Sequence, residues 1–126
     1  MTSSSKRILV AEDEAILAFD LQAKLAAAGF EVIGPLRTCA AALRAAEDRL
    51  PDFALLDIHL ADGFCWSAAD YLAARDVPTG FMTGFAMAEA IPLSFRGAPR
   101  LSKPIHDVNL LHLLAKLSGK TLLPEN

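Results

Sequence analysis

Polar side chains that could do chemistry follow several of the short apolar segments of this chain. Glu12 and Asp13 follow the first such segment, Asp57 follows the third, Thr83 ends the fourth and Lys103 follows the fifth. If these segments are parallel strands of one sheet, their carboxyl ends meet at the same edge of the sheet. The sequence therefore predicts that three carboxylates, one hydroxyl and one ammonium lie together at this edge, which we call the mouth of the sheet.

Such a cluster has a definite chemistry. Two like charges about 4 Å apart repel by about 4 kcal/mol at an effective dielectric near 20, so three carboxylates need a counter-charge. A hard divalent cation relieves the repulsion, and an all-oxygen ligand set suits Mg²⁺. Bound Mg²⁺ offers phosphate oxygens a place to bind, while Lys103 and Thr83 hold the others and Gly84 lets phosphate approach the backbone. Asp57 would then be the anionic oxygen nucleophile of a phosphoryl transfer.

The segments that must position these side chains alternate between strand and helix patterns. Strands are expected at 8–11, 30–33, 53–56, 79–83 and 98–102, and helices at 13–28, 38–50, 64–74 and 107–117. Thr38 and Asp107 are expected to cap helices, and Gly34-Pro35 to end the second strand. The segment 84–97 contains Pro92 and has no clear amphipathic period, so its helix should be short or irregular. The repeated strand–helix order predicts a doubly wound α/β fold, a five-stranded parallel sheet with helices on both faces.

Length and composition restrict the class of protein. The 126 residues suit one domain, 1–126, with a core at about 6–118, and 53% apolar against 21% charged residues argues against disorder. The net charge of −3 argues against binding to nucleic acid or to an anionic membrane surface. The polar start is not typical of a signal peptide and no stretch approaches a membrane span, so a cytoplasmic location is expected. Cys39 and Cys65 are expected to be reduced thiols.

Four segments together resemble the response-regulator receiver family of bacterial two-component signalling. They are ILVAEDE at 8–14, FALLDIHLADG at 53–63, FMTGF at 81–85 and LSKP at 101–104. Each is weak alone, but their order and spacing are jointly specific, and the resemblance covers about 6–117. It implies a flavodoxin-like fold with strand order 2-1-3-4-5.

The resemblance also implies roles for residues around the metal. Asp57 would be the phosphorylated residue and would itself contact Mg²⁺. Asp13 would ligate Mg²⁺ directly, and Glu12 directly or through water. The third protein ligand would be the backbone carbonyl of His59, whose side chain would flank the pocket and tune access of water.

The phosphoryl group would be held by other residues. By the same resemblance, Thr83 would bond a phosphoryl oxygen and shift toward it, with Gly84 beside it, and Lys103 would pair with the group. The Lys103-Pro104 bond is expected to be cis. Glu14 is expected only to stabilise the start of the helix that follows it.

The resemblance further implies partners. The phosphoryl donor would be the phosphohistidine of a histidine kinase or of a histidine phosphotransfer protein, and the chain would be a phosphoprotein of a phosphorelay rather than an enzyme. FMTGF is similar to the Phe-Ala-Thr-Gly motif of "FAT GUY" receivers, which are common in alphaproteobacteria and often tied to general stress signalling. Only nine residues follow the helix that ends near Leu117, so the expected output is contact with a downstream protein through 84–97, the fifth strand and the last helix.

Two alternatives remain open at this point. Many receivers carry Tyr or Phe three residues before the lysine, where this chain has Arg100, so the chain could be a degenerate receiver used only as a binding module. A small Mg²⁺-dependent aspartyl phosphohydrolase is the other alternative. Such enzymes usually carry a second acid two residues after the nucleophile, where His59 stands.

Overall fold

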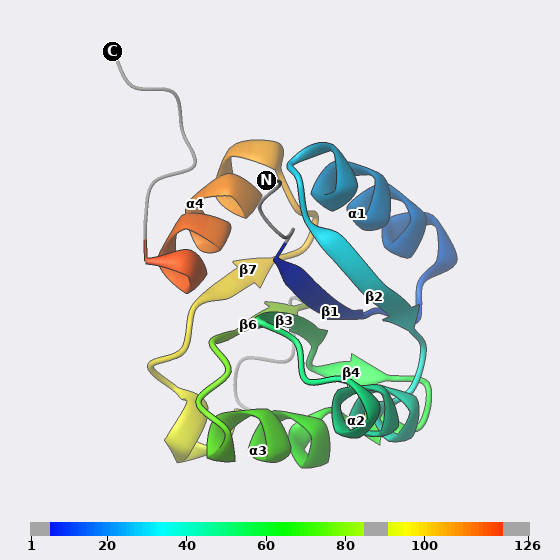
Figure 1. Ribbon diagram of the computed structural model, residues 1–126, viewed down its shortest axis with the longest axis vertical. Helices are drawn as coiled ribbons and strands as arrows, with labels where there is room; N and C mark the ends of the chain where they lie inside the picture. Colours follow the sequence, from blue (N-terminus) through cyan, green and yellow to red (C-terminus); the bar gives the residue numbers. More distant parts are fainter. Residues whose placement is uncertain (1–5, 85–90, 120–126) are drawn as a thin grey trace, which may run out of the picture.

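Five parallel strands form the centre of the molecule, and helices cover both faces of their sheet (Figure 1). The computed structural model describes residues 6–84 and 91–119. The strands of the sheet, in spatial order, are β2 (Glu31–Leu36), β1 (Arg7–Ala11), β3 (Phe53–Asp57), β6 (Thr79–Thr83) and β7 (Arg100–Ser102). Counted within this sheet, β6 and β7 are the fourth and fifth strands. The predicted doubly wound fold with strand order 2-1-3-4-5 is therefore confirmed.

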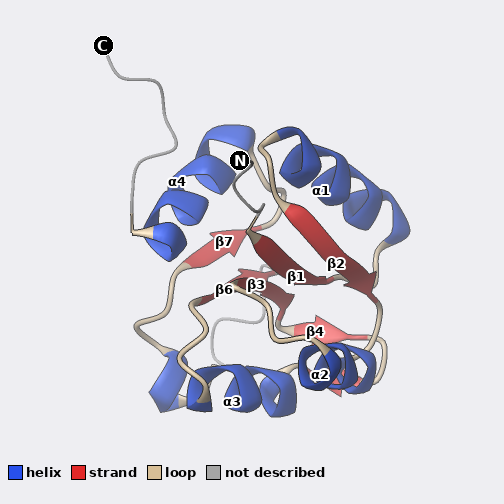
Figure 2. Cartoon of the chain, in the orientation of Figure 1, coloured by secondary structure: helices blue, strands red, loops and turns tan. Residues whose placement is uncertain are grey.

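Each face of the sheet carries its own layer of helices (Figure 2). The helices are α1 (Ala15–Ala27), α2 (Cys39–Asp48), α3 (Trp66–Ala74) and α4 (Asp107–Ser118). Leu9 and Ala11 of β1 pack into the core that includes α2 and α3, whereas Ile8 and Val10 pack into the core that includes α1 and α4. Alternate side chains of a strand point to opposite faces, so covering both faces buries the strand throughout. This explains why β1 and β3 are continuous apolar runs.

The second strand does not end at Gly34-Pro35 as predicted. β2 runs on to Leu36, and its register against β1 shifts between Leu9 and Ala11. Gly34 lies in the left-handed region with φ of 109°, and the Gly34-Pro35 bond is cis. Pro35 is tolerated because β2 is an edge strand, where a missing N–H leaves no neighbouring strand unpaired.

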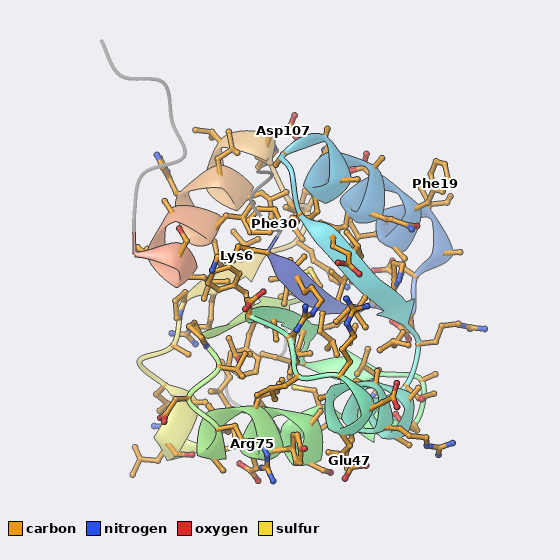
Figure 3. The ribbon with its side chains drawn as sticks, in the orientation of Figure 1. Lys6, Phe19, Phe30, Glu47, Arg75 and Asp107 are labelled. Atoms are coloured by element: carbon orange, nitrogen blue, oxygen red, sulfur yellow. The ribbon has the colours of Figure 1, made fainter. Side chains whose placement is uncertain are left out.

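Two other element boundaries differ from the prediction. The helix expected from residue 64 begins at Trp66, because Gly63–Phe64 (β5) pairs with His59–Leu60 (β4) as a short antiparallel hairpin. The N-cap of α4 is His106 rather than Asp107. Asp107, labelled in Figure 3, is instead the first helical residue and forms an ion pair of 2.5 Å with Lys24 of α1. The predicted cap of α2 is confirmed, since Thr38 Oγ1 accepts a hydrogen bond of 3.0 Å from the Ala41 N–H.

The remaining expectations concern the segment 84–97 and the cysteines. Of this segment, residues 91–97 contain one 3₁₀ turn, η2 (Leu93–Phe95), while 85–90 lie outside the described residues. Cys39 and Cys65 are both buried, and both are free cysteines that form no disulfide. Within the described ranges, no helix has the length and apolar character needed to cross a membrane.

Candidate functional site

The predicted site residues converge at the carboxyl ends of the strands. Glu12 follows β1, Asp57 ends β3 and Thr83 ends β6, and these three are 1%, 4% and 7% exposed. Lys103 follows β7, and an open hollow of about 290 Å³ lies at these strand ends. The hollow is lined by Asp13, Glu14, Asp57, His59, Gly84 and Lys103. The fold alone brings them together, because parallel strands deliver their ends to one edge.

Three carboxylates form an acidic cluster at these strand ends. Glu12, Asp13 and Asp57 each present a carboxylate oxygen, and these oxygens all lie within 4.8 Å of one another. Burial raises the pKa of Glu12 to about 7, with the charge of Asp57 acting in the same direction and the Glu14 N–H and Lys103 opposing it. The cluster is therefore short of positive charge in this state of the molecule.

One buried oxygen in this cluster has no hydrogen bond. Glu12 Oε2 accepts from the Glu14 N–H at 2.9 Å and from Lys103 Nζ at 3.3 Å. Glu12 Oε1 lies 3.1 Å from the same Nζ but makes no hydrogen bond with it or with any other described group. A buried anionic oxygen without a donor, next to two further carboxylates, fits a hard cation such as Mg²⁺.

Lys103 connects the carboxylates. Its Nζ donates to Asp57 Oδ2 at 2.7 Å and to Glu14 Oε1 at 2.9 Å, in addition to Glu12. Burial alone lowers the pKa of Lys103, but the hydrogen bonds to Asp57, Glu14 and Glu12 outweigh burial and raise it above its ordinary value. The ammonium is therefore charged at any physiological pH. The peptide bond after it, Lys103-Pro104, is cis as expected.

The contact of Glu14 with Lys103 was not predicted from the sequence. The sequence predicts only that Glu14 stabilises the start of the helix, and Glu14 is indeed the N-cap of α1, but its side chain makes no capping hydrogen bond. Its carboxylate turns to the mouth instead. The available signal was its place directly after Glu12 and Asp13, which puts it at the same strand end.

The hairpin after Asp57 holds His59 at the edge of the hollow. The His59 N–H donates to Asp57 Oδ1 at 3.2 Å, so both oxygens of the Asp57 carboxylate have a donor. The His59 side chain is exposed, and its ring meets the Phe64 ring edge-on at 5.5 Å between centroids. The imidazole therefore flanks the hollow, as expected of it.

A second carboxylate fixes this hairpin to α2. Asp62, in the turn between β4 and β5, accepts hydrogen bonds from the N–H groups of Cys39 at 2.7 Å and Ala40 at 3.1 Å. These bonds lower the pKa of Asp62. Asp62 thus caps the first turn of α2 from a distant part of the chain and ties the hairpin that contains His59 to this helix. The sequence predicted a turn at this position but not this contact.

Gly84 lines the hollow, and Thr83 precedes it as the last residue of β6. Thr83 Oγ1 donates to the carbonyl oxygen of Gly84 at 3.0 Å, so its hydroxyl is engaged locally and can rotate to another acceptor. A Cβ built on Gly84 would meet nothing within 4 Å. The backbone at Gly84 is thus open to the hollow.

Comparison with known proteins identifies the family. No family model matches the chain. SdrG from Sphingomonas melonis Fr1 is 35% identical in sequence to this chain. The match covers 93% of this chain and 99% of the SdrG chain, and the two structures superpose with a TM-score of 0.81. The receiver domain of the sensor histidine kinase PA1611 from Pseudomonas aeruginosa is 25% identical over 93% of this chain and 100% of its own, with a TM-score of 0.79. The chain belongs to the response-regulator receiver family.

Two further facts bear on this receiver. The PA1611 receiver structure has a magnesium ion coordinated in its active-site cleft. The phyllosphere-induced regulator PhyR from Methylorubrum extorquens is 41% identical over 81 residues, which are 62% of this chain and 30% of PhyR. The chain thus spans less than half the length of the curated relatives it matches.

Proposed function

We propose that this receiver is the phosphoacceptor of a two-component phosphorelay. A phosphoryl group would pass in line from the phosphohistidine of a histidine kinase or a histidine phosphotransfer protein to Asp57. The observation that carries the proposal is the placement of Asp57. Its carboxylate is buried at the end of a central strand, bonded to Lys103, and grouped with two carboxylates that lack sufficient counter-charge.

The metal-binding part of the proposal uses the acidic cluster. Glu12, Asp13 and Asp57 would hold Mg²⁺ together with the backbone carbonyl of His59. When bound, Mg²⁺ supplies charge neutralisation for the carboxylates and the phosphoryl oxygens. The orphaned Glu12 Oε1 and the raised pKa of Glu12 support this use of the cluster.

The transfer step uses the remaining residues. A carboxylate oxygen of Asp57 forms the bond to phosphorus as the phosphorus–nitrogen bond breaks, and the electron pair stays on the imidazole of the donor. Lys103 and the Thr83 hydroxyl would hold phosphoryl oxygens, which requires Thr83 to give up its bond to Gly84. Hydrolysis then follows when water attacks phosphorus and the Asp57 carboxylate leaves.

The proposed activity is signalling rather than turnover of a substrate. The alternative of a small phosphohydrolase lacks support, because the residue two positions after Asp57 is His59 and its side chain is exposed beside the hollow. The alternative of a degenerate module lacks support too, because the carboxyl ends of the strands carry the full set of Glu12, Asp13, Asp57, Thr83 and Lys103. We place the receiver in the cytoplasm, and its FMTGF segment and its likeness to PhyR support a role in general stress signalling.

The output would be contact with a downstream protein. A groove of about 480 Å³ runs between β7 and α4, and Arg100, His106, His112 and Lys116 line it. None of the described residues that line this groove is acidic. The groove therefore suits an anionic surface on the partner, and Arg100 adds positive charge where many receivers carry an aromatic ring.

A labelling experiment tests the proposed function. The protein is incubated with Mg²⁺ and acetyl phosphate, and its intact mass is measured alongside the variant Asp57→Asn. We expect the wild type to gain one phosphoryl group and the variant to gain none. Continuous turnover of a small phosphoester would favour the hydrolase, and no gain in the presence of bound Mg²⁺ would favour the degenerate module.

A further inference from the structure

The ammonium of Lys103 has all its hydrogen-bonding capacity in use. Its Nζ contacts Asp57, Glu14 and Glu12 at 2.7, 2.9 and 3.3 Å. An ammonium has three N–H donors, and here three carboxylates accept them. A phosphoryl oxygen can therefore accept a hydrogen bond from Lys103 only if one of these three carboxylates gives up its own hydrogen bond to the ammonium.

Glu14 is the partner that can leave most readily. The side chains of Glu12 and Asp57 are 0% and 6% exposed and belong to the ends of central strands, whereas the side chain of Glu14 is 63% exposed. Releasing a carboxylate into water costs little when water already solvates most of it, whereas a buried carboxylate can leave the ammonium only where another partner, such as Mg²⁺, replaces it. The exchange should therefore occur at Glu14.

We propose that Glu14 is a displaceable partner of Lys103. In the resting receiver, the Glu14 carboxylate accepts the N–H of Lys103 that the phosphoryl group takes after transfer. The inference rests on the proposed function and adds a residue to it. Glu14 lines the same hollow as Asp57 and Lys103, so it borders the space that a phosphoryl group on Asp57 would enter. It acts as a positioning residue, because it sets the availability of Lys103 and takes no part in bond making.

The position of Glu14 allows a clean variant. Glu14→Gln keeps the size of the side chain, and Glu14 makes no side-chain capping bond that this change could remove. The backbone N–H of residue 14 still donates to Glu12 Oε2. A matched control is Glu47→Gln on α2 (Figure 3), which removes the same charge from an exposed position.

The first arm of the test measures the rate of phosphorylation by acetyl phosphate with Mg²⁺. We expect Glu14→Gln to raise the rate by about threefold to tenfold, because charge-assisted contacts at partly exposed sites have effects of this order. Glu47→Gln should leave the rate unchanged. Salt at about 0.5 M should reduce the gain, since it screens an exposed carboxylate.

The second arm separates the contact with Lys103 from general repulsion of an anionic donor. In a Lys103→Met background, Glu14→Gln should no longer raise the rate. An equal gain in both backgrounds would overturn the inference, because Glu14 would then act on the donor and not on Lys103. Equal rates for the wild type and Glu14→Gln would overturn it as well, while the proposed function would stand.

The third arm needs no phosphorylation. In the Mg²⁺-free protein, the Cε–H signal of Lys103 in an NMR spectrum should move in Glu14→Gln and stay in place in Glu47→Gln. An unchanged Lys103 signal would show that Glu14 does not hold the ammonium. If no variant and no wild type gains a phosphoryl group, the proposed function fails, which the rates of the first arm distinguish from a failure at Glu14.

Discussion

At the scale of single residues, the site gathers three carboxylates around one ammonium. Glu12, Glu14 and Asp57 contact Lys103, Asp13 lies beside Glu12 and Asp57, and Glu12 is the most deeply buried of these carboxylates. Burial of a carboxylate in such company opposes its ionisation, which is why its pKa rises. The clustered carboxylates of the resting site thus destabilise the fold and favour binding of a cation.

A pH dependence follows from Glu12. Its pKa is raised from 4.5 to about 7, so between these values the folded protein binds more protons than the unfolded chain. The contribution of Glu12 to the free energy of unfolding must therefore fall as pH rises from about 4.5 to 7. In the Mg²⁺-free protein we expect a loss of about 1 to 3 kcal/mol across this window.

The variant Glu12→Gln should lack this loss and be more stable than the wild type above pH 7. The measurement is the urea midpoint in EDTA at intervals from pH 5 to 8 for both proteins, where the difference between them isolates Glu12 from other titrating groups. Parallel pH profiles for the two proteins would contradict the assignment. Added Mg²⁺ should remove most of the slope of the wild type, since a bound cation favours the ionised carboxylate.

The residues of the site differ in how well the sequence could predict them. The placement of Asp57 at the mouth was predictable because it directly follows a buried apolar strand, and that of Lys103 because it stands between the fifth strand and Pro104. The role of Glu14 was not, because a carboxylate after a strand can serve the helix start equally well. Only the direction of the Glu14 side chain distinguishes a role at the helix start from a role in the site, and sequence spacing does not determine that direction.

At the scale of elements, the edge strand β2 contains the most constrained backbone position. A Cβ added to Gly34 would lie 2.7 Å from the Val10 carbonyl oxygen and 2.8 Å from the Leu36 nitrogen, and its φ of 109° is unfavourable to any other residue. Both contacts are with backbone, so a rotamer change cannot relieve them. Gly34 thus allows β2 to continue past its bulge while paired to β1.

We predict that Gly34→Ala lowers the free energy of unfolding by about 2 to 3 kcal/mol, from strain and close contact together. Gly97→Ala is the matched control, because a Cβ there would meet nothing within 4 Å and its φ is not positive. Urea denaturation of the two variants and the wild type measures the effect. Equal stability of Gly34→Ala and Gly97→Ala would be inconsistent with this account of β2.

The sequence predicted the type of the main elements better than it predicted where they begin and end. Burial on both faces makes the strands of the central sheet read as apolar runs, so β1, β3 and β6 were found. The hairpin of β4 and β5 was missed because each strand has two residues, too few for any periodicity. The continuation of β2 was missed because Gly-Pro ordinarily ends a strand, and a bulge on an edge is a tertiary exception to that rule.

At the scale of the whole molecule, charge is unevenly distributed. The chain carries a net charge of −3, yet the groove between β7 and α4 is lined by Arg100, Lys116 and two histidines, without an acidic neighbour among its described lining. The mouth that holds the acidic cluster has the opposite character. Lys103 and its neighbour Pro104 line the groove as well, so the two regions adjoin.

We predict that the groove binds an anionic peptide. A glutamate-rich peptide of about ten residues should shift the NMR amide signals of Arg100, Asn109 and His112 in a salt-dependent manner. The double change Arg100→Glu with Lys116→Glu should weaken this binding by about fivefold or more, because it reverses two cationic positions. The double change Arg44→Glu with Arg75→Glu, at exposed positions outside the groove, changes the total charge by the same amount and should leave binding nearly intact. Equal weakening by the control would show that the groove has no special part in it.

The central claim is that Asp57 and no other carboxylate of the mouth accepts the phosphoryl group. The most direct measurement treats the protein with Mg²⁺ and acetyl phosphate, reduces the acyl phosphate with borohydride, and maps the peptides by mass spectrometry. Reduction converts an aspartyl phosphate to homoserine, so the position of the label is fixed covalently. We predict homoserine at position 57 alone. Homoserine at position 13 or elsewhere, or its absence at 57 in a protein that has gained a phosphoryl group, would contradict the account.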